Sequence, residues 1–240
     1  MSDIPALSIR LQAVYDIATA ASGAKGRFID VGSDHGYLSL HALKEERYSY
    51  CIATDIHEDP ASKTRRILAA YGYEDRSAAY CTDGLDGIPL EINDTVVMAG
   101  LGGNNMMDIL TRAAASTTED VLSSVTWCFQ PQKTIEPLRQ FLYEHGYSIL
   151  DEDVCFDRGI YYPIIIARFD GIVKKLNLIE KYYGPVLVSK FREKQGPVMT
   201  YFEYLNGRFI TWSRQRISIN SQSALHQKHF PVRAAGMNRI

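Results

Sequence analysis

The sequence predicts an α/β fold in which a mostly parallel, seven-stranded sheet is doubly wound, with helices on both faces and an antiparallel strand at the end. Between residues 7 and 146, short apolar runs alternate with segments in which apolar residues recur every three or four positions. Asp157-Arg158-Gly159 then joins two long apolar runs, a turn sequence typical of a β-hairpin. Parallel strands need crossover helices, whereas a hairpin adds an antiparallel strand, so the two patterns together predict this mixed sheet.

Strands are expected where apolar and β-branched residues are bounded by glycine, proline or polar residues. They cover residues 27–31, 50–54, 77–81, 94–99, 125–129, 147–156 and 160–168. Helices are expected at residues 7–20, 37–47, 59–71, 106–115 and 135–145, where the apolar period is three to four. Asp59 is expected to cap the third of these helices, with Pro60 at its first position and Gly72 at its end.

The pattern changes near Asp170, where we place a boundary between a domain at residues 1–170 and a helical extension at residues 171–240. The domain has 14 Lys and Arg against 25 Asp and Glu, a net charge of −11, whereas the extension has 12 against 3, a net charge of +9. Residues 197–226 show helical apolar spacing with arginines between, which indicates a helix or a broken helical hairpin. A basic extension favours contact with a polyanion such as nucleic acid, and a solvated basic helix is the alternative.

Composition indicates a globular protein that stays in the cytoplasm. The 240 residues are 46% hydrophobic, enough for a core, yet no apolar run has the length of a signal sequence or a membrane span. Cys51, Cys81, Cys128 and Cys155 are widely spaced and form no C-x-x-C pair. We therefore expect reduced thiols, no disulfide frame and no metal site.

Acidic residues and glycines follow the first four strands, where ligands bind in a doubly wound sheet. Gly32-Ser33-Asp34-His35-Gly36 follows the first strand, Asp55 ends the second, Asp83-Gly84 follows the third, and a glycine-rich loop follows the fourth. A carboxylate after the second strand offers two acceptors to the vicinal hydroxyls of a ribose, and Asp83 with the backbone of Gly84 suits an adenine edge. The sequence therefore predicts a nucleoside-cofactor site.

The charge of the first turn distinguishes between two classes of nucleoside cofactor. A dinucleotide such as NAD places its pyrophosphate on a G-x-G-x-x-G turn, but here Asp34 occupies the place of the second glycine. S-adenosylmethionine has no phosphate and carries cationic sulfonium and ammonium groups, which suit an acidic turn. Asp30, within the first strand, adds a second carboxylate. These residues favour S-adenosylmethionine.

Five motifs occur in order along the chain. They are Asp-Val-Gly-Ser-Asp-His-Gly-Tyr-Leu (30–38), Asp-Gly-Leu (83–85), Met-Ala-Gly-Leu-Gly-Gly (98–103), Gln-Pro-Gln (130–132) and Gly-Ile-Tyr-Tyr (159–162). Together they resemble the motifs of the bacterial tRNA (adenine-22-N1) methyltransferases, the TrmK family. The chain departs from the family pattern at Gly36, Asp55, Gln132 and Pro163, where the family usually has Ala, Glu, Asn and Glu.

The resemblance implies a class I, Rossmann-like methyltransferase domain that binds S-adenosylmethionine, with a helical C-terminal extension that helps to engage tRNA. The candidate cofactor-binding residues are Asp30, Gly32, Ser33, Asp34, Gly36, Asp55, Ile56, Asp83, Gly84, Ala99 and Gly100. The candidate catalytic residues are Asp34, His35, Tyr37, Gln130 and Tyr162.

The expected chemistry needs no covalent nucleophile. Adenine N1 has an in-plane lone pair that attacks the sulfonium methyl group directly, so positioning is expected to supply most of the rate. Methylation makes the ring cationic, and Asp34 is the leading candidate to stabilise that charge or to accept a hydrogen bond from the exocyclic amine. Tyr161 or Tyr162 is expected to stack on the extruded base, and because the two alternate on a strand at most one faces the site.

Several alternatives stay open at the level of the sequence. Asp34 is equally suited to cap the helix that begins near Gly36, and His35 is more often a structural residue than a base. Three other functions remain for the chain: a nicotinamide oxidoreductase, a small-molecule methyltransferase on the same fold, and an RNA-binding protein with a vestigial cofactor site.

Overall fold

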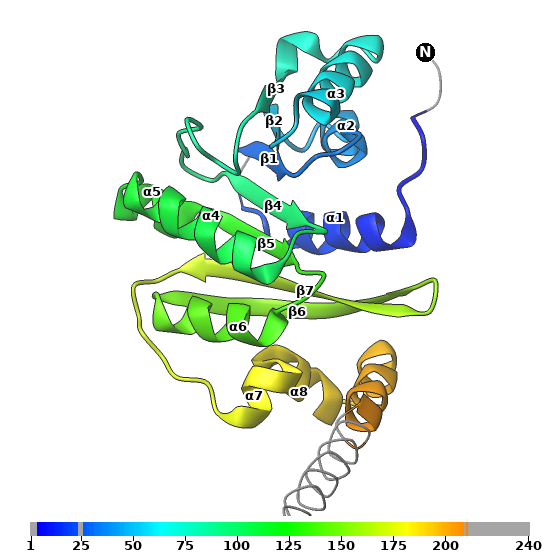
Figure 1. Cartoon of the computed structure of the whole chain (residues 1–240), viewed down its shortest axis with the longest axis vertical. Coiled ribbons are helices and arrows are strands. Elements are labelled where there is room, and N and C mark those ends of the chain that lie inside the picture. The colour runs from blue at the N-terminus through cyan, green and yellow to red at the C-terminus, as the bar shows by residue number, and fades with distance from the viewer. Residues whose placement is uncertain (1–3, 24–25, 209, 211–240) are drawn as a thin grey trace, which may run out of the picture.

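The computed structural model describes residues 4–23, 26–208 and 210, and it confirms the predicted fold class (Figure 1). Within these residues, seven strands form one sheet in the order β3-β2-β1-β4-β5-β7-β6. The strands are β1 (Arg27–Val31), β2 (Tyr50–Asp55), β3 (Ser77–Cys81), β4 (Thr95–Ala99), β5 (Thr126–Gln130), β6 (Tyr147–Asp157) and β7 (Ile160–Phe169). Neighbours among β1 to β5 pair in parallel, and β7 is antiparallel to both β5 and β6. Strand order reverses at β1, which pairs with β2 on one side and β4 on the other.

Helices cover both faces of the sheet. They are α1 (Ile9–Ala21), α2 (Tyr37–Lys44), α3 (Glu58–Ala70), α4 (Gly103–Ala115), α5 (Glu119–Ser124), α6 (Ile135–Glu144), α7 (Leu178–Tyr183) and α8 (Pro185–Arg192), with a 3₁₀ turn at Glu74–Arg76 and a further helix at residues 196–208. None of the helices in the described ranges is long and apolar enough to cross a membrane.

Side-chain alternation along the strands divides the core into two apolar layers. In β1, Phe28 belongs to one layer, and Ile29 and Val31 belong to the other. The layer with Phe28 is covered by α1, α2 and α3, and the layer with Ile29 is covered by α4 and α6. Helix α1 packs on the same face as α2, and its residues Arg10 and Leu11 line a cavity together with the loops that follow β1 and β4.

Some element boundaries differ from the sequence prediction. Helix α3 begins at Glu58 with His57 as its N-cap, so the prediction that Asp59 caps it is wrong. Asp59 lies in the first turn, where an acidic side chain is also favourable because it meets the positive end of the helix dipole. Helix α4 begins at Gly103 rather than Met106, and α5 shows no signal in the sequence because its six residues are too few to display a helical period.

The predicted β-hairpin is confirmed. Arg158 and Gly159 form its two-residue loop between the paired residues Asp157 and Ile160, and both have positive φ, 50° and 83°. Positive φ at both loop residues gives the loop a twist that matches that of the strands. This conformation favours glycine, which explains Gly159 at the second position.

The described part of the extension packs against this hairpin (Figure 1). Leu187, Val198, Tyr201, Phe202 and Leu205 form a third buried cluster with Val154 of β6. Of the helix predicted at residues 197–226, residues 197–208 and 210 are helical, and residues 209 and 211–226 lie outside the described part of the chain.

A buried ion pair joins α6, β6 and the start of the extension. Arg139 Nε donates to Glu152 Oε1 at 2.8 Å, and neither side chain is exposed. The other carboxylate oxygen of Glu152 accepts the backbone N–H groups of Val186 (2.9 Å) and Leu187 (3.3 Å) at the amino end of α8. One carboxylate therefore serves both a guanidinium group and the positive end of a helix.

Candidate active site

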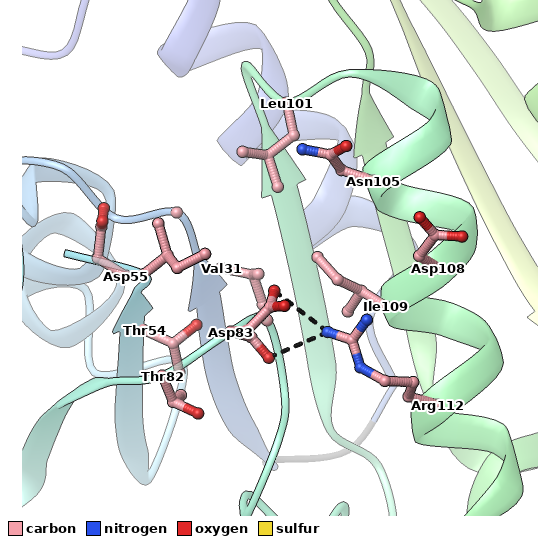
Figure 2. Close-up of a pocket in the computed structure, with 13 residues that line it drawn as sticks. Val31, Thr54, Asp55, Thr82, Asp83, Leu101, Asn105, Asp108, Ile109 and Arg112 are labelled. Carbon is pink, nitrogen blue, oxygen red and sulfur yellow. Dashed lines mark hydrogen bonds and ion pairs between the residues drawn. The ribbon is translucent and has the colours of Figure 1, made fainter.

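Two cavities adjoin at the carboxyl edge of the sheet, where strand order reverses. The first cavity, of about 310 Å³, is bounded by the ends of β1 and β2, the residues after β3, and α4 (Figure 2). The second cavity, of about 320 Å³, is bounded by α1 and by the loops after β1 and β4. Gly32 and Leu101 line both cavities, so one elongated ligand can span them. The fold predicts a nucleoside cofactor at this place.

The predicted cofactor residues divide between the two cavities. Gly32, Asp55, Ile56, Asp83 and Gly84 line the first, and Asp30, Gly32, Ser33, Asp34, Ala99 and Gly100 line the second. Gly36 lines neither. Its φ is +68°, and a Cβ there would lie 2.6 Å from Thr64 Cγ2, so glycine allows the first turn to pack against α3.

Asp55 is fixed at the end of β2. Its Oδ2 accepts the backbone N–H of Asp34 at 3.2 Å, and its Oδ1 accepts that of His57 at 3.1 Å. Each oxygen keeps a lone pair for a ligand hydroxyl, which suits the vicinal diol of a ribose. Ile56, beside it, is 60% exposed and offers an apolar surface to the same ligand.

Asp83 is held by an arginine from α4. In Figure 2, Arg112 points toward Asp83, with Nη2 3.1 Å from the carboxylate Oδ1 and 3.3 Å from the backbone oxygen. Arg112 Nε also donates to Asp86 at 2.8 Å. Sequence reasoning missed three α4 residues of this cavity, Asp108, Ile109 and Arg112. Their spacing of three and four residues could have identified them, because residues at this spacing lie on one face of a helix.

Asp34 has an exposed side chain on a left-handed backbone. Its φ is +49°, its side chain is 73% exposed, and Oδ2 lies 3.6 Å from His35 Nε2. Gly36 is the N-cap of α2 and no side chain caps that helix, so the alternative that Asp34 is a helix cap is wrong. A left-handed conformation costs a non-glycine residue about 1 kcal/mol or more. Asp34, His35 and Tyr37 all line the second cavity, and strain of this kind is often found at ligand sites.

Asp30 is a buried carboxylate at the second cavity. Ser39 Oγ donates to its Oδ2 at 2.8 Å, and burial raises the pKa of Asp30 to about 6. Within the described chain no cationic side chain is paired with it. A buried carboxylate without a cationic partner suits the ammonium and sulfonium groups of S-adenosylmethionine, so the residues present fit this cofactor.

We expect Asp30→Asn to flatten the pH dependence of stability between pH 4 and pH 6. The carboxyl binds its proton more tightly in the folded protein, with a pKa of about 6, than at the ordinary value of 3.8. The contribution of the Asp30 carboxyl to stability is therefore fully present below pH 4 and is lost as the pH rises through the folded pKa, by about 3 kcal/mol. Urea unfolding across this range measures the difference between the two proteins, with Asp75→Asn at the surface as the control. Parallel wild-type and Asp30→Asn curves would contradict the expectation.

The other two catalytic candidates contact Arg10 of α1. Gln130 is fully buried; its Oε1 accepts from Arg10 Nη1 at 2.6 Å and its Nε2 donates to the oxygen of Pro131 at 3.1 Å. The Arg10 guanidinium lies over the ring of Tyr162, 5.6 Å from its centroid. Gln130 and Tyr162 do not line the second cavity, whereas Arg10 and Gln132 do. Sequence reasoning missed Arg10, whose partner Gln130 is 120 residues away.

Tyr161 and Tyr162 lie on opposite faces of β7. Tyr161 packs against the rings of Phe156, Tyr201 and Tyr204, at centroid distances of 4.6, 5.5 and 5.0 Å. Tyr161 therefore belongs to the third cluster, and of the two only Tyr162 lies on the side of Arg10.

Comparison with known proteins gives consistent matches. The family model of a methyltransferase domain matches residues 7–165. The tRNA (adenine(22)-N(1))-methyltransferase of Bacillus subtilis is 27% identical over 191 residues, covering 77% of this chain and 76% of that protein. A Mycoplasma pneumoniae protein with the provisional name tRNA methyltransferase is 30% identical over 179 residues, covering 72% of this chain and 78% of that protein.

A solved structure has the same fold over nearly the whole chain. It is a Streptococcus pneumoniae protein with the provisional name tRNA (m1A22) methyltransferase, in complex with S-adenosyl-L-methionine. The TM-score is 0.71 at 22% identity, and the match covers 92% of this chain and 99% of that one.

Proposed function

This chain belongs to the methyltransferase-domain family, within the group of bacterial tRNA (adenine-22-N1) methyltransferases, and on this premise we propose that it methylates N1 of an adenine in tRNA with S-adenosylmethionine as the methyl donor. The observation that carries the proposal is the pair of adjoining cavities. One has acceptors for a ribose and an adenine, and the other has the buried, unpaired carboxylate of Asp30. The B. subtilis relative gives adenine 22 as the target position.

Each cavity has residues that suit a different part of the cofactor. Asp55 would accept the ribose hydroxyls, Asp83 would accept a hydrogen bond from the adenine amine, and Asp30 would place its negative charge at the cationic end. When bound, S-adenosylmethionine would supply a methyl group on a cationic sulfonium; the lone pair of adenine N1 would form the new N–CH3 bond as the S–CH3 bond breaks and neutral S-adenosylhomocysteine leaves. Because a lone pair forms the new bond, no residue has to remove a proton from N1 beforehand.

Asp34 is the residue that we assign to the target base. Its carboxylate is exposed at the second cavity and has only the neighbouring His35 as an ion-pair partner within the described chain. There it can accept a hydrogen bond from the exocyclic amine and face the positive charge that develops on the ring. Tyr162, behind Arg10, is the aromatic candidate to stack on the base.

Nucleoside analysis tests the proposed function. Unmodified tRNA is incubated with the protein and labelled S-adenosylmethionine, and the digested product is separated into nucleosides. We expect 1-methyladenosine, and we expect it to disappear when adenine 22 is replaced by guanine. Binding of tRNA without methyl transfer, or transfer to small molecules alone, would overturn the proposal.

We further propose that the extension at residues 171–240 is the docking surface for tRNA, which also implies a cytoplasmic site of action. Its net charge of +9 supports this role, and residues 211–240 alone contain five Lys and Arg and no Asp or Glu. Neutralised phosphates release counterions, so binding through these residues would be strongly salt-dependent.

Replacing Arg214, Arg216 and Lys228 together by Gln should weaken tRNA binding and make it less salt-dependent. For each phosphate that the variant no longer neutralises, the slope of log K against log salt concentration should change by about 0.9. Filter binding at several salt concentrations measures the slope, and cofactor affinity should not change. The matched control replaces Lys44, Lys63 and Arg66, which are exposed on α2 and α3. An equal effect of both triple substitutions would contradict docking by the extension.

A further inference from the structure

Three aromatic rings and one arginine form a continuous row across the hairpin and the helix at residues 196–208, which lie side by side (Figure 1). Phe156 of β6 and Tyr161 of β7 are paired directly across the strands, and their ring centroids are 4.6 Å apart. Tyr204 of the helix lies next, with its centroid 5.0 Å from that of Tyr161. One helical turn further along, the Arg208 guanidinium lies over the Tyr204 ring, 5.7 Å from its centroid. These four side chains form one surface, the aromatic row.

The outer rings of the aromatic row are not needed to fill the core beneath them. Tyr201 and Phe202, which are 4% and 6% exposed, pack the helix against the hairpin. Phe156 and Tyr204, in contrast, are 54% and 43% exposed. Each of these two rings leaves much of its area in water although it contacts another ring. Large apolar side chains that are exposed together, rather than scattered singly, indicate a contact surface for a partner.

The charges around the aromatic row indicate that this partner is an anion. Arg208 is exposed, and no carboxylate of the described chain pairs with it. Arg158, in the hairpin loop two residues after Phe156, is also exposed. The extension that contains Tyr204 and Arg208 has a net charge of +9. Nucleic acid combines negative charge with flat rings, and its bases stack on aromatic side chains and on guanidinium planes.

An unpaired base is the part of a nucleic acid that can reach these rings. In a duplex each base is stacked between its neighbours, whereas a base in a loop exposes a face. The hairpin also connects the aromatic row to the active site, because Tyr161 lies in the row and Tyr162, on the opposite face, contacts Arg10 of the second cavity. An adenine that is extruded into that cavity loses its stacking on the flanking bases. The aromatic row offers one of those bases a new stacking surface.

We propose that the aromatic row binds an unpaired base that flanks the target adenine in the RNA. Phe156 and Tyr204 contact the base, Tyr161 supports both rings from below, and Arg208 orients Tyr204 and adds positive charge. The inference rests on the proposed methylation of tRNA. It identifies a contact that depends on ring stacking and is therefore separate from phosphate binding by the basic residues of the extension.

Replacing Phe156 and Tyr204 together by Leu tests the stacking role, because Leu keeps an apolar side chain and removes the ring. We expect the Kd of unmodified tRNA, measured on the full chain by fluorescence anisotropy, to rise by about 5- to 100-fold. The slope of log K against log salt concentration should stay unchanged, since no phosphate contact is removed. Tyr80→Leu is the matched control, because that ring is 46% exposed on β3, at the other edge of the sheet.

Two comparisons test whether the bound group is a base. Phe156→Tyr combined with Tyr204→Phe keeps both rings and should keep the wild-type affinity. A hairpin RNA with a single-stranded loop should bind the Leu variant more weakly than the wild type, whereas a blunt duplex with the same stem should bind both proteins equally. Cofactor affinity and the urea midpoint show whether the Leu variant is folded. If its midpoint falls, Tyr204→Leu alone serves as the test, with an expected rise in Kd of about fivefold or more.

The opposite results would overturn the proposal. Unchanged tRNA affinity of the Leu variant would show that the rings only pack the helix on the hairpin. Equal losses for loop RNA and duplex would exclude an unpaired base, and a changed oligomeric state with unchanged RNA affinity would assign the aromatic row to a protein interface. Wild-type protein that binds tRNA without methylating it would contradict the proposed function but not the stacking contact, so the two failures are distinguishable.

Discussion

Asp34→Asn should lower the turnover number for tRNA methylation by about 100-fold or more, the size of effect seen when one stabilising group is removed from a developing charge. The substitution removes the negative charge but keeps the size of the side chain. Asn is also one of the few residues that tolerate a positive φ, so the turn at φ +49° should keep its shape. Alanine would be a poorer test, because strain in the turn would add to the loss of charge.

Steady-state kinetics separates the two candidate roles of Asp34, which are stabilisation of the methylated base and contact with the cofactor. Steady-state rates are taken at saturating tRNA while the cofactor concentration is varied. A fall in kcat indicates stabilisation of the methylated ring, whereas a rise in KM for the cofactor alone indicates a cofactor contact. Asp59→Asn, an exposed carboxylate in the first turn of α3, is the matched control. Full activity of Asp34→Asn would remove Asp34 from both roles.

Glu152→Ala should destabilise the protein by about 3–5 kcal/mol, because it leaves the charge of Arg139 buried without its partner. The substitution also takes the acceptor away from the N–H groups of Val186 and Leu187 at the start of α8. Two further donors of Arg139 face the backbone oxygens of Lys181 (3.3 Å) and Tyr182 (3.1 Å), which are not charged. The amino end of α8 should therefore lose its hydrogen bonds to β6, while the ion pair between Lys190 of α8 and Asp151 of β6, 2.8 Å long, remains.

Urea unfolding measures the effect, and two comparisons identify its cause. Glu58→Ala breaks a pair of similar length, 2.6 Å from Arg65, whose side chains are 46% and 61% exposed. We expect a loss below about 1 kcal/mol there, because water screens an exposed pair. Replacing Arg139 by Met and Glu152 by Leu together should restore much of the stability, since no buried charge is left. Equal losses of unfolding free energy in Glu152→Ala and Glu58→Ala would show that burial does not increase the cost of breaking the pair.

The cofactor site was accessible to sequence reasoning because its parts are local. In a parallel sheet every strand delivers the residues that follow it to the same edge, so Gly32, Asp34, Asp55 and Asp83 had to lie near one another once the strands were assigned. The charge of Asp34 then distinguished between a dinucleotide and S-adenosylmethionine without any knowledge of distances.

The role of Asp34 was not accessible in the same way. An Asp two residues before a helix satisfies both a capping pattern and a ligand pattern, because both use a short carboxylate in a turn. The backbone excludes the capping role, because Gly36 is the N-cap, and it leaves the side chain of Asp34 exposed at the second cavity.

The sequence by itself determined the seven strands and their order along the chain, the hairpin at Arg158-Gly159, and the acidic, glycine-bearing strand ends that line the two cavities, because each depends on residues close together in the chain. Only the tertiary structure decided which distant side chains pair with one another. Arg10 meets Gln130 across 120 residues, Arg112 reaches Asp83 from a different element, and Glu152 of β6 turns inward to Arg139 and α8. Such pairs leave no local pattern, because what brings them together is the packing of helices on the sheet.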